Sequence, residues 1–207
     1  MMQNLAPMTR NLLIANLAVF VLHWVMPELR WDFTLYYPLM EEFRPYQLLT
    51  HMFTHAPGLG HIFGNMLSLF FFGSVLERTF GSNRFLTFYL ICGLGATFLF
   101  EGAVALEHYL VASTIDGAQS AVMGASGAVF GILMAFAMLY PNVEIMLLFP
   151  PIPIKAKYFV LIYGAYELYA TINRFQGDNV AHLAHLGGML FAFILVKLWK
   201  NELRRGY

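Results

Sequence analysis

The amino-acid sequence predicts an all-α polytopic membrane protein, a bundle of six transmembrane helices in a single domain over residues 1–207. Of the 207 residues, 59% are hydrophobic and 12% are charged, whereas roughly a quarter of an ordinary soluble domain is charged. Six apolar segments are long enough to cross the hydrocarbon core of a bilayer. The sequence lacks the long alternating stretches of a membrane β-barrel, so these segments are expected to be helices.

The expected spans alternate with loops of different character. The first span follows a single basic residue and no small-residue cleavage site, which favours a retained signal anchor. Residues 27–60 are too long for a bare link and carry several aromatic side chains, so a structured element at the outer membrane interface is expected. The segment FPPIPIK at 149–155 contains three prolines and is expected to be a stiff, extended connector. The six spans are expected at 11–26, 61–80, 85–106, 121–140, 157–173 and 180–199.

Charge sets the expected orientation and the expected partners. Nine of the 12 Lys and Arg side chains fall on one side of the membrane if both termini are cytoplasmic, as the positive-inside rule requires. The balance of 12 basic and 12 acidic residues gives no field that would recruit nucleic acid, so nucleic acid is not an expected partner. The apolar composition makes the lipid bilayer the expected one. A short chain without appended domains favours a bacterial inner membrane. Cys92, the single cysteine, is interpreted as a packing residue.

Four polar residues on three of the spans are expected to meet near the outer face. Ser126 and His185 each lie roughly five residues into a span that runs inward, so both lie roughly 7 to 8 Å below the outer end of their helices. His61 and Asn65 are one turn apart and open another inward-running span. Because polar groups inside a membrane are costly, this convergence indicates a functional site.

The four residues suit the hydrolysis of an amide bond. A serine hydroxyl is a weak nucleophile that needs a neighbouring base, and the His185 imidazole is a suitable one. Hydrolysis also needs donors directed at the developing oxyanion. The backbone N–H of Ser126 near a helix start, the His61 imidazole and the Asn65 amide are donors of this kind. The glycines of GASG at 124–127 are expected to leave room for backbone and substrate.

Four motifs in chain order resemble those of the rhomboid family of intramembrane serine proteases. GASG, which includes Gly124 and Gly127, matches the family's GxSG, and AHLGG at 184–188 is similar to the motif around its catalytic histidine. HIFGN at 61–65 matches HxxxN, and GSVLERTFG at 73–81 matches GxxxExxxG. The resemblance runs from the second expected span to the sixth.

The resemblance implies a serine endopeptidase with Ser126 as nucleophile and His185 as general base, a dyad without an acidic third member and without a metal or other cofactor. It implies that His61, Asn65 and the Ser126 backbone bind the oxyanion. Phe130 takes the position of an aromatic ring against the catalytic imidazole. The implied substrates are single-pass membrane proteins cut in or near the outer part of their transmembrane segment, and the oligomeric state is left open.

The fifth span and residues 174–179 would then form the family's gate and cap. Two positions depart from the family pattern. The first outer loop has Arg44 without the tryptophan of a Trp-Arg pair, which leaves the anchoring of the loop open. Ala192 stands where relatives often have glycine and is still small enough for close helix contact.

Other interpretations of the polar residues stay open. A rhomboid-like protein that binds transmembrane helices without cutting them is the alternative. A small-solute transporter using Glu167 and the histidines would be expected to show an internal duplication, which is not evident. The spacings of His182 with His185 and of His51 with His55 also suit zinc. Glu77 is expected to have a structural role, Glu167 to have a structural role paired with a neighbouring helix, and His182 to lie at the mouth of the site.

Overall fold

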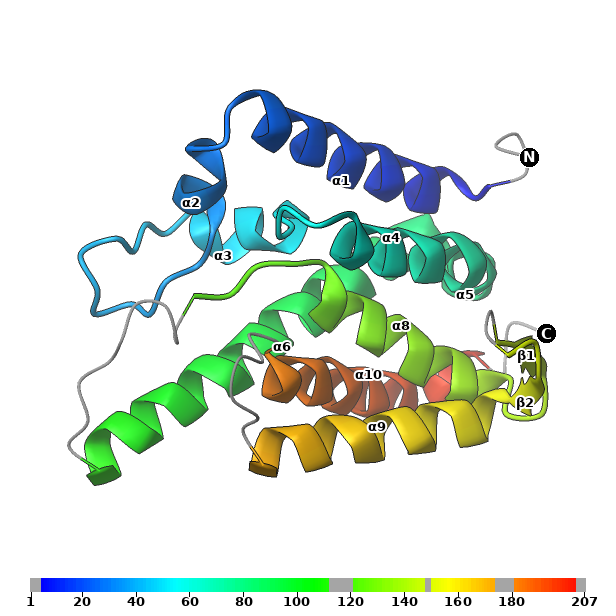
Figure 1. Ribbon diagram of the computed structural model, residues 1–207. Coiled ribbons are helices and arrows are strands. Elements are labelled where there is room, and N and C mark those ends of the chain that lie inside the picture. The colour runs from blue at the N-terminus through cyan, green and yellow to red at the C-terminus, as the bar shows by residue number, and fades with distance from the viewer. Residues whose placement is uncertain (1–4, 112–120, 148–149, 174–180, 204–207) are drawn as a thin grey trace.

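The computed structural model describes residues 5–111, 121–147, 150–173 and 181–203. Long helices dominate these residues, and a short antiparallel pair of strands precedes α9 (Figure 1). The expected cap at 174–179 lies outside the described residues. The helices are α1 Pro7–Val25, α2 Leu29–Phe33, α3 Gln47–Thr50, η2 His51–Phe53, α4 Leu59–Ser68, η3 Leu69–Gly73, α5 Ser74–Phe80, α6 Ser82–Val111, α8 Ser126–Leu139, α9 Ala156–Asn173 and α10 His182–Leu203; the strands are β1 Glu144–Met146 and β2 Pro153–Lys155.

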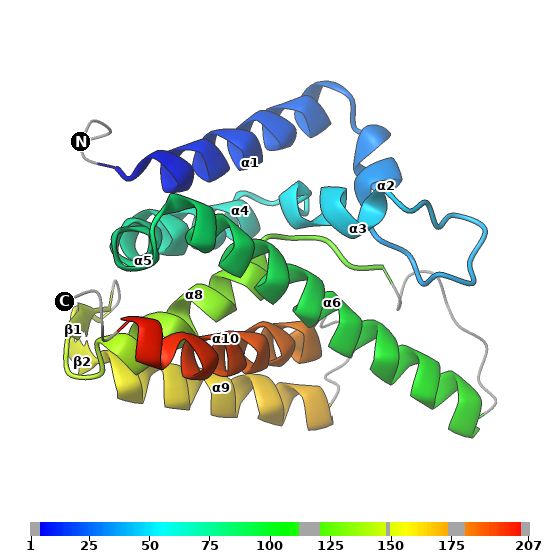
Figure 2. The same ribbon diagram turned by 180° about the vertical axis from the view of Figure 1, so that it is seen from behind.

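The long helices alternate in direction, as connected membrane spans do. The helix formed by α4, η3 and α5 runs in the same direction as α8 and α10, and α1, α6 and α9 run in the opposite direction (Figures 1 and 2). Within the described residues, 4 helices are long and apolar enough to cross a membrane: Pro7–Val25, Leu59–Phe80, Ser82–Leu110 and His182–Trp199. The protein is therefore a helical membrane protein, and the count of six spans stays a prediction.

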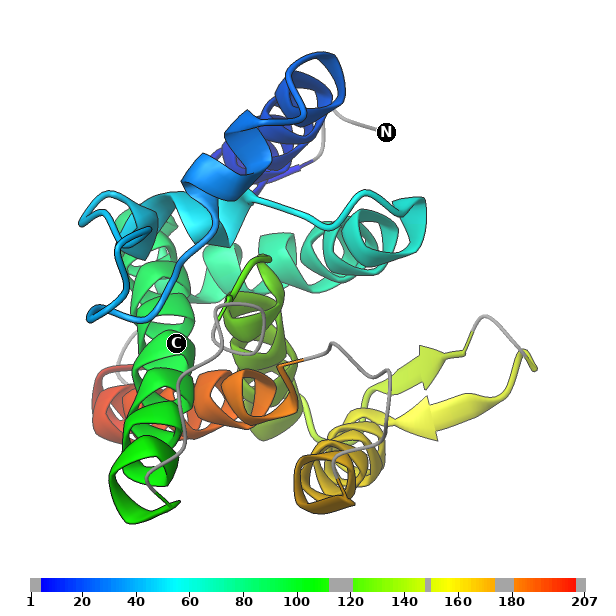
Figure 3. The ribbon, with the colours of Figure 1, turned by 60° about the vertical axis from the view of Figure 1, so that its left-hand side comes forward.

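Helix α8 lies at the centre of the bundle. It contacts α4, α6, α9 and α10, and Figure 3 shows these helices around it. Ten of its 14 residues are buried, so it faces protein and not lipid on nearly every side. At 1.5 Å per residue it is about 21 Å long, shorter than the ~30 Å hydrocarbon core, so its first residue lies below the membrane surface if its other end reaches the opposite side.

The expected span at 121–140 begins too early, because residues 121–125 are not helical. Val122 pairs with Leu35 of the first outer loop through two backbone hydrogen bonds, Leu35 N to Val122 O at 3.0 Å and Val122 N to Leu35 O at 2.8 Å. Gly124 has φ of 129°, a conformation that excludes it from a right-handed helix and favours glycine. The helix therefore begins at Ser126, and an extended segment leads to it.

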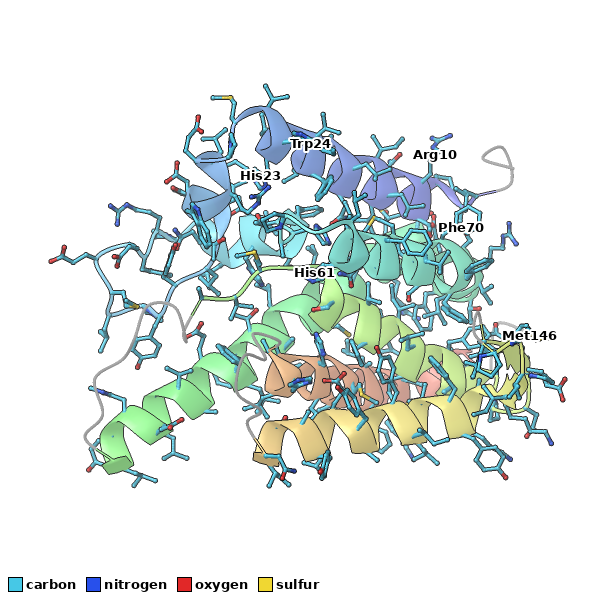
Figure 4. The ribbon with its side chains drawn as sticks, viewed as in Figure 1. Arg10, His23, Trp24, His61, Phe70 and Met146 are labelled. Carbon is cyan, nitrogen blue, oxygen red and sulfur yellow. The ribbon has the colours of Figure 1, made fainter. Side chains whose placement is uncertain are left out.

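The buried stripe of α1 is more polar than its exposed face, the reverse of a soluble helix. Thr9, Asn16 and His23 are each 0% exposed, whereas Trp24 and Val25 are 70% and 74% exposed. His23 lies on the side of α1 that faces the rest of the protein (Figure 4). An apolar outer face is what contact with lipid requires, because lipid tails are as apolar as the exposed side chains.

Glu77 has the structural role expected of it. Its carboxylate accepts hydrogen bonds from the backbone N–H groups of Met8 and Thr9 at 2.9 and 2.7 Å, and from the hydroxyls of Thr9 and Ser82 at 2.9 and 2.6 Å. The N–H groups at the start of a helix have no acceptor within the helix, and a negatively charged carboxylate there interacts favourably with the helix dipole. Glu77 therefore joins the starts of α1 and α6 to the end of α5.

The first outer loop is structured, and its anchor is not at Arg44. The Arg44 guanidinium donates to the nearby carbonyl oxygens of Glu41 and Phe43. Gln47, which is buried, instead donates through Nε2 to the carbonyl oxygens of Asp32 and Glu42 at 3.2 and 3.0 Å. A buried amide at position 47 thus holds the loop together.

His51 connects this loop to the rest of the bundle. Burial lowers the pKa of His51 to about 4, so its ring is neutral at pH 7. Its Nδ1 donates to the Gln47 carbonyl oxygen at 2.8 Å, and its Nε2 lies 2.8 Å from the Thr97 hydroxyl on α6. The His51 carbonyl oxygen accepts the N–H of Gly124 at 2.9 Å. The loop therefore supports the segment that leads into α8.

The prolines between α8 and α9 form part of a hairpin. Strand β2 pairs with β1, with Lys155 opposite Glu144 and Pro153 opposite Met146. The expected extended connector is thus extended but paired, since opposite charges across the strands favour pairing and a proline is tolerated at the edge of a sheet. Residues 148–149 lie outside the described part of the chain.

Candidate active site

Ser126 and His185 meet at the starts of two parallel helices. Ser126 is the first residue of α8, and His185 lies in the first turn of α10. The Ser126 Oγ lies 2.9 Å from the His185 Nε2, within hydrogen-bond distance. The helices α8 and α10 run in the same direction (Figure 1). Two residues that lie equally far from the outer ends of these helices can therefore contact each other.

Glycines bring the two helices together. A Cβ atom on Gly188 would lie 1.9 Å from the Gly127 carbonyl oxygen, and one on Gly127 would lie 2.5 Å from the Ala96 Cβ on α6. Any larger residue at these positions would push the helices apart. Gly127 was expected to make room for backbone and substrate, and the structure shows the approach of backbone, because neighbouring helices pack directly against this glycine.

Gly124 has a different role from Gly127. Besides its positive φ, a Cβ atom there would lie 2.8 Å from the His61 Nε2 and 3.6 Å from the Ser126 Oγ. The absence of a side chain at Gly124 therefore allows the His61 imidazole to approach the nucleophile candidate.

The position of His61 suits a hydrogen-bond donor. Its Nδ1 accepts the Ala56 N–H at 3.3 Å, which places the ring proton of the neutral imidazole on Nε2. This N–H lies beside Gly124, at the end of α4 nearest the start of α8 (Figure 4). The N–H of Ser126 has no acceptor within its own helix, and no side chain caps α8 at Ala125.

Asn65 is less well placed than His61. Its side-chain nitrogen donates to the His61 carbonyl oxygen at 3.0 Å within α4. The amide therefore donates to a carbonyl oxygen of its own helix, and its side chain would have to rotate to reach a group bound at Ser126.

Phe130 lies against the imidazole of His185. The two rings are stacked with centroids 4.1 Å apart and planes 9° apart. The centroid of the Tyr163 ring on α9 lies 5.0 Å from the centroid of the Phe130 ring. This stacking limits rotation of the His185 ring about its side-chain bonds.

Glu167 of α9 also contacts His185, which was not expected from the sequence. Its Oε2 lies 2.9 Å from the His185 Nδ1 and 2.6 Å from the His182 Nδ1. All three side chains are buried, with Glu167 2% exposed and each histidine 8% exposed. The donor atoms of this cluster lie within 4.8 Å of one another and could hold a metal ion. The expected structural pairing of Glu167 thus has both histidines as its partners.

His55 is a further buried histidine beside the site. Its ring makes an edge contact with that of His61, with centroids 5.1 Å apart. Burial lowers the pKa of His55 to about 4, so its ring is neutral at pH 7. His51 and His55 are thus buried parts of the loop.

The chain is similar to proteins of one family. Residues 42–201, most of the chain, match the family model described as the Rhomboid domain. RHOMBOID-like protein 12, mitochondrial, of Arabidopsis thaliana is 30% identical over 89% of this chain and 56% of its own length. Rhomboid protein 1, mitochondrial, of Saccharomyces cerevisiae is 28% identical over 88% of this chain and 50% of its own length. The chain thus spans about half the length of these two relatives. The rhomboid protein YdcA of Bacillus subtilis is 29% identical over 78% of this chain and 71% of its own length.

Proposed function

The chain belongs to the rhomboid family, and we propose that it is an intramembrane serine endopeptidase that uses Ser126 and His185. The observation that carries the proposal is the 2.9 Å hydrogen bond between the Ser126 Oγ and the His185 Nε2. A nucleophile in contact with a base, with the base oriented by further groups, is the arrangement that covalent catalysis requires.

The reaction would proceed through an acyl-enzyme. The Ser126 hydroxyl gives its proton to the His185 Nε2 as its oxygen attacks the carbonyl carbon of the substrate. The imidazolium then gives this proton to the leaving amine as the C–N bond breaks, which leaves an ester on Ser126. His185 next deprotonates a water molecule that attacks the ester, and the proton returns to the Ser126 oxygen.

The negative charge of the tetrahedral intermediate would fall between two donors. The Ser126 N–H and the Nε2–H of His61 are on the side of the nucleophile next to Gly124, where no side chain obstructs them. One such donor is commonly worth ~10²–10³ in kcat. Asn65 would contribute only after its amide leaves the His61 carbonyl oxygen.

The proposed substrates are single-pass membrane proteins, cut in or near the outer part of their transmembrane segment. The proposed topology has six spans, with both termini in the cytoplasm and the site open to the outer side, because nine of the 12 basic residues then lie inside. Two of the relatives above are named as mitochondrial, a further relative from Arabidopsis thaliana is named as chloroplastic, and one comes from a bacterium. The comparisons therefore do not support the expected bacterial inner membrane.

Cleavage of a reporter transmembrane substrate in proteoliposomes tests the proposal. We expect the wild type to cut the reporter, and Ser126→Ala and His185→Ala to leave it intact while keeping the wild-type unfolding temperature. Equal cutting by wild type and either variant would refute the mechanism. If the wild type co-purifies with the reporter but never cuts it, the alternative of a non-proteolytic binding protein holds instead.

A further inference from the structure

We infer that Glu167 is a positioning residue that sets the tautomer and the orientation of the His185 imidazole in the Ser126–His185 dyad. The inference rests on the proposed function, because it assigns a role within that reaction. It is carried by one buried carboxylate oxygen that contacts two histidine rings, at 2.9 Å from His185 and 2.6 Å from His182.

The tautomer follows from hydrogen-bond chemistry. An ionised carboxylate accepts hydrogen bonds and donates none, so each Nδ1 that contacts the Glu167 Oε2 must carry a proton. A neutral imidazole has one ring proton. With that proton on Nδ1, the His185 Nε2 has a free electron pair, and it is this atom that lies 2.9 Å from the Ser126 Oγ. Glu167 thus selects the form of His185 that can accept the serine proton.

The same contact supports the charge that develops during the reaction. When the His185 Nε2 takes the Ser126 proton, the ring becomes an imidazolium whose Nδ1–H still donates to Glu167. The proton on Nδ1 does not transfer, so the carboxylate stays ionised and faces a positive ring. A charge-assisted hydrogen bond is roughly twice as strong as a neutral one, and Glu167 is almost fully removed from water, where such contacts are strongest.

The cluster also keeps the imidazole from turning. Three contacts converge on His185: Ser126 at Nε2, Glu167 at Nδ1, and the Phe130 ring against its face. His182 donates to the same carboxylate oxygen from a ring set at 84° to that of His185, which holds the carboxylate in place. The Glu167 carboxylate, which orients His185, is therefore itself held in place by His182.

A purely structural role for Glu167 makes a different prediction. Both histidines belong to α10, so either contact would tie α9 to α10, but only the His185 contact bears on the base. His182→Phe removes one of these two contacts and leaves the contact between Glu167 and His185, whereas Glu167→Gln keeps the shape of the side chain and removes its charge. Glu101→Gln on α6 is the matched control for charge removal, because the Glu101 carboxylate has no hydrogen-bond partner among the described residues.

The experiment measures kcat, KM and unfolding temperature in proteoliposomes for wild type and these three variants, with Ser126→Ala as the test of the proposed function. We expect Glu167→Gln to lower kcat by about 10²- to 10⁴-fold with KM within about threefold and little change in unfolding temperature. We expect His182→Phe to lower kcat by less than about tenfold, and Glu101→Gln to cleave as the wild type does. Wild-type kcat in Glu167→Gln, or a loss of kcat in proportion to stability across both the Glu167 and His182 variants, would overturn the inference.

A readout independent of cleavage separates the two claims. ¹⁵N NMR of histidine-labelled protein, with the His185 signals assigned from their loss in His185→Ala, should show a protonated Nδ1 and an unprotonated Nε2 in the wild type. A proton on Nε2 of His185 would overturn the inference whether or not the protein cuts the reporter. Cleavage that is lost on chelation and restored by Zn²⁺ would also overturn it, since a metal on these nitrogens requires that both Nδ1 protons be absent.

Discussion

Gly188→Ala tests how closely the two helices of the site must approach. The new Cβ would lie 1.9 Å from the Gly127 carbonyl oxygen, about 1.5 Å or more short of an ordinary van der Waals contact. The atom in the way belongs to the backbone of a buried helix, so it cannot rotate aside. We therefore expect α10 to move away from α8 by about 1 Å or more, at a cost in unfolding free energy of about 1–3 kcal/mol.

That movement should act directly on the site. The Ser126 Oγ and His185 Nε2 are 2.9 Å apart, and a further 1 Å would take them beyond hydrogen-bond distance. A misplacement of this size can cost about 10²-fold in rate. The assays are the initial rate of reporter cleavage and the unfolding temperature. Gly102→Ala on α6 is the control, because a Cβ there meets nothing within 4 Å. If Gly188→Ala cuts and unfolds as Gly102→Ala does, the reasoning about helix contact is wrong.

Two further predictions concern stability and need no substrate. Glu77→Ala should lower the free energy of unfolding by about 3 kcal/mol or more, because two N–H groups at the start of α1 and two hydroxyls lose the carboxylate that accepts their hydrogen bonds. Denaturation in detergent measures this change. A change below about 1 kcal/mol would contradict the structural role of Glu77. The pKa of His51 is lowered by burial from 6.5 to about 4, so between these values the unfolded chain binds a proton that the folded one does not. His51 should therefore contribute nothing to the pH dependence of stability above pH 6.5, and a fall of about 1.4 kcal/mol per unit of pH toward pH 4. His55, whose pKa burial also lowers to about 4, should add a similar slope. His51→Gln should therefore reduce the measured slope by about 1.4 kcal/mol per unit of pH without abolishing it, and an unchanged slope would count against a neutral, buried ring.

The sequence predicts the order of the helices and the meeting of Ser126 with His185, because both depend on one-dimensional quantities. The lengths of the apolar segments predict where the helices lie in the sequence, and the number of residues from the outer end of a helix predicts how deep a residue lies in the membrane. The start of α8 is different. It depends on Gly124, whose positive φ is stabilised by partners from a distant loop, and a run of apolar and small residues does not reveal them.

Glu167 shows what depth alone leaves undetermined. It precedes the end of α9 by six residues, so the same count that pairs Ser126 with His185 places it near their level. That count was the signal that could have identified it. Depth does not give the rotation of a helix about its axis, however, and the rotation decides whether a carboxylate faces lipid, a loop or an imidazole. The anchor of the first outer loop escaped prediction for a related reason, since Gln47 acts through carbonyl oxygens that no residue pattern marks.

The most direct test of the central claim is the mass of the adduct formed with a serine-directed fluorophosphonate. In the wild type we expect one modified peptide, with the phosphonyl group on Ser126, and we expect His185→Ala to slow its formation by about 10²-fold or more because the base is gone. A wild-type protein that cuts the reporter yet carries the adduct elsewhere, or labelling that survives Ser126→Ala, would contradict the assignment of Ser126 as the nucleophile.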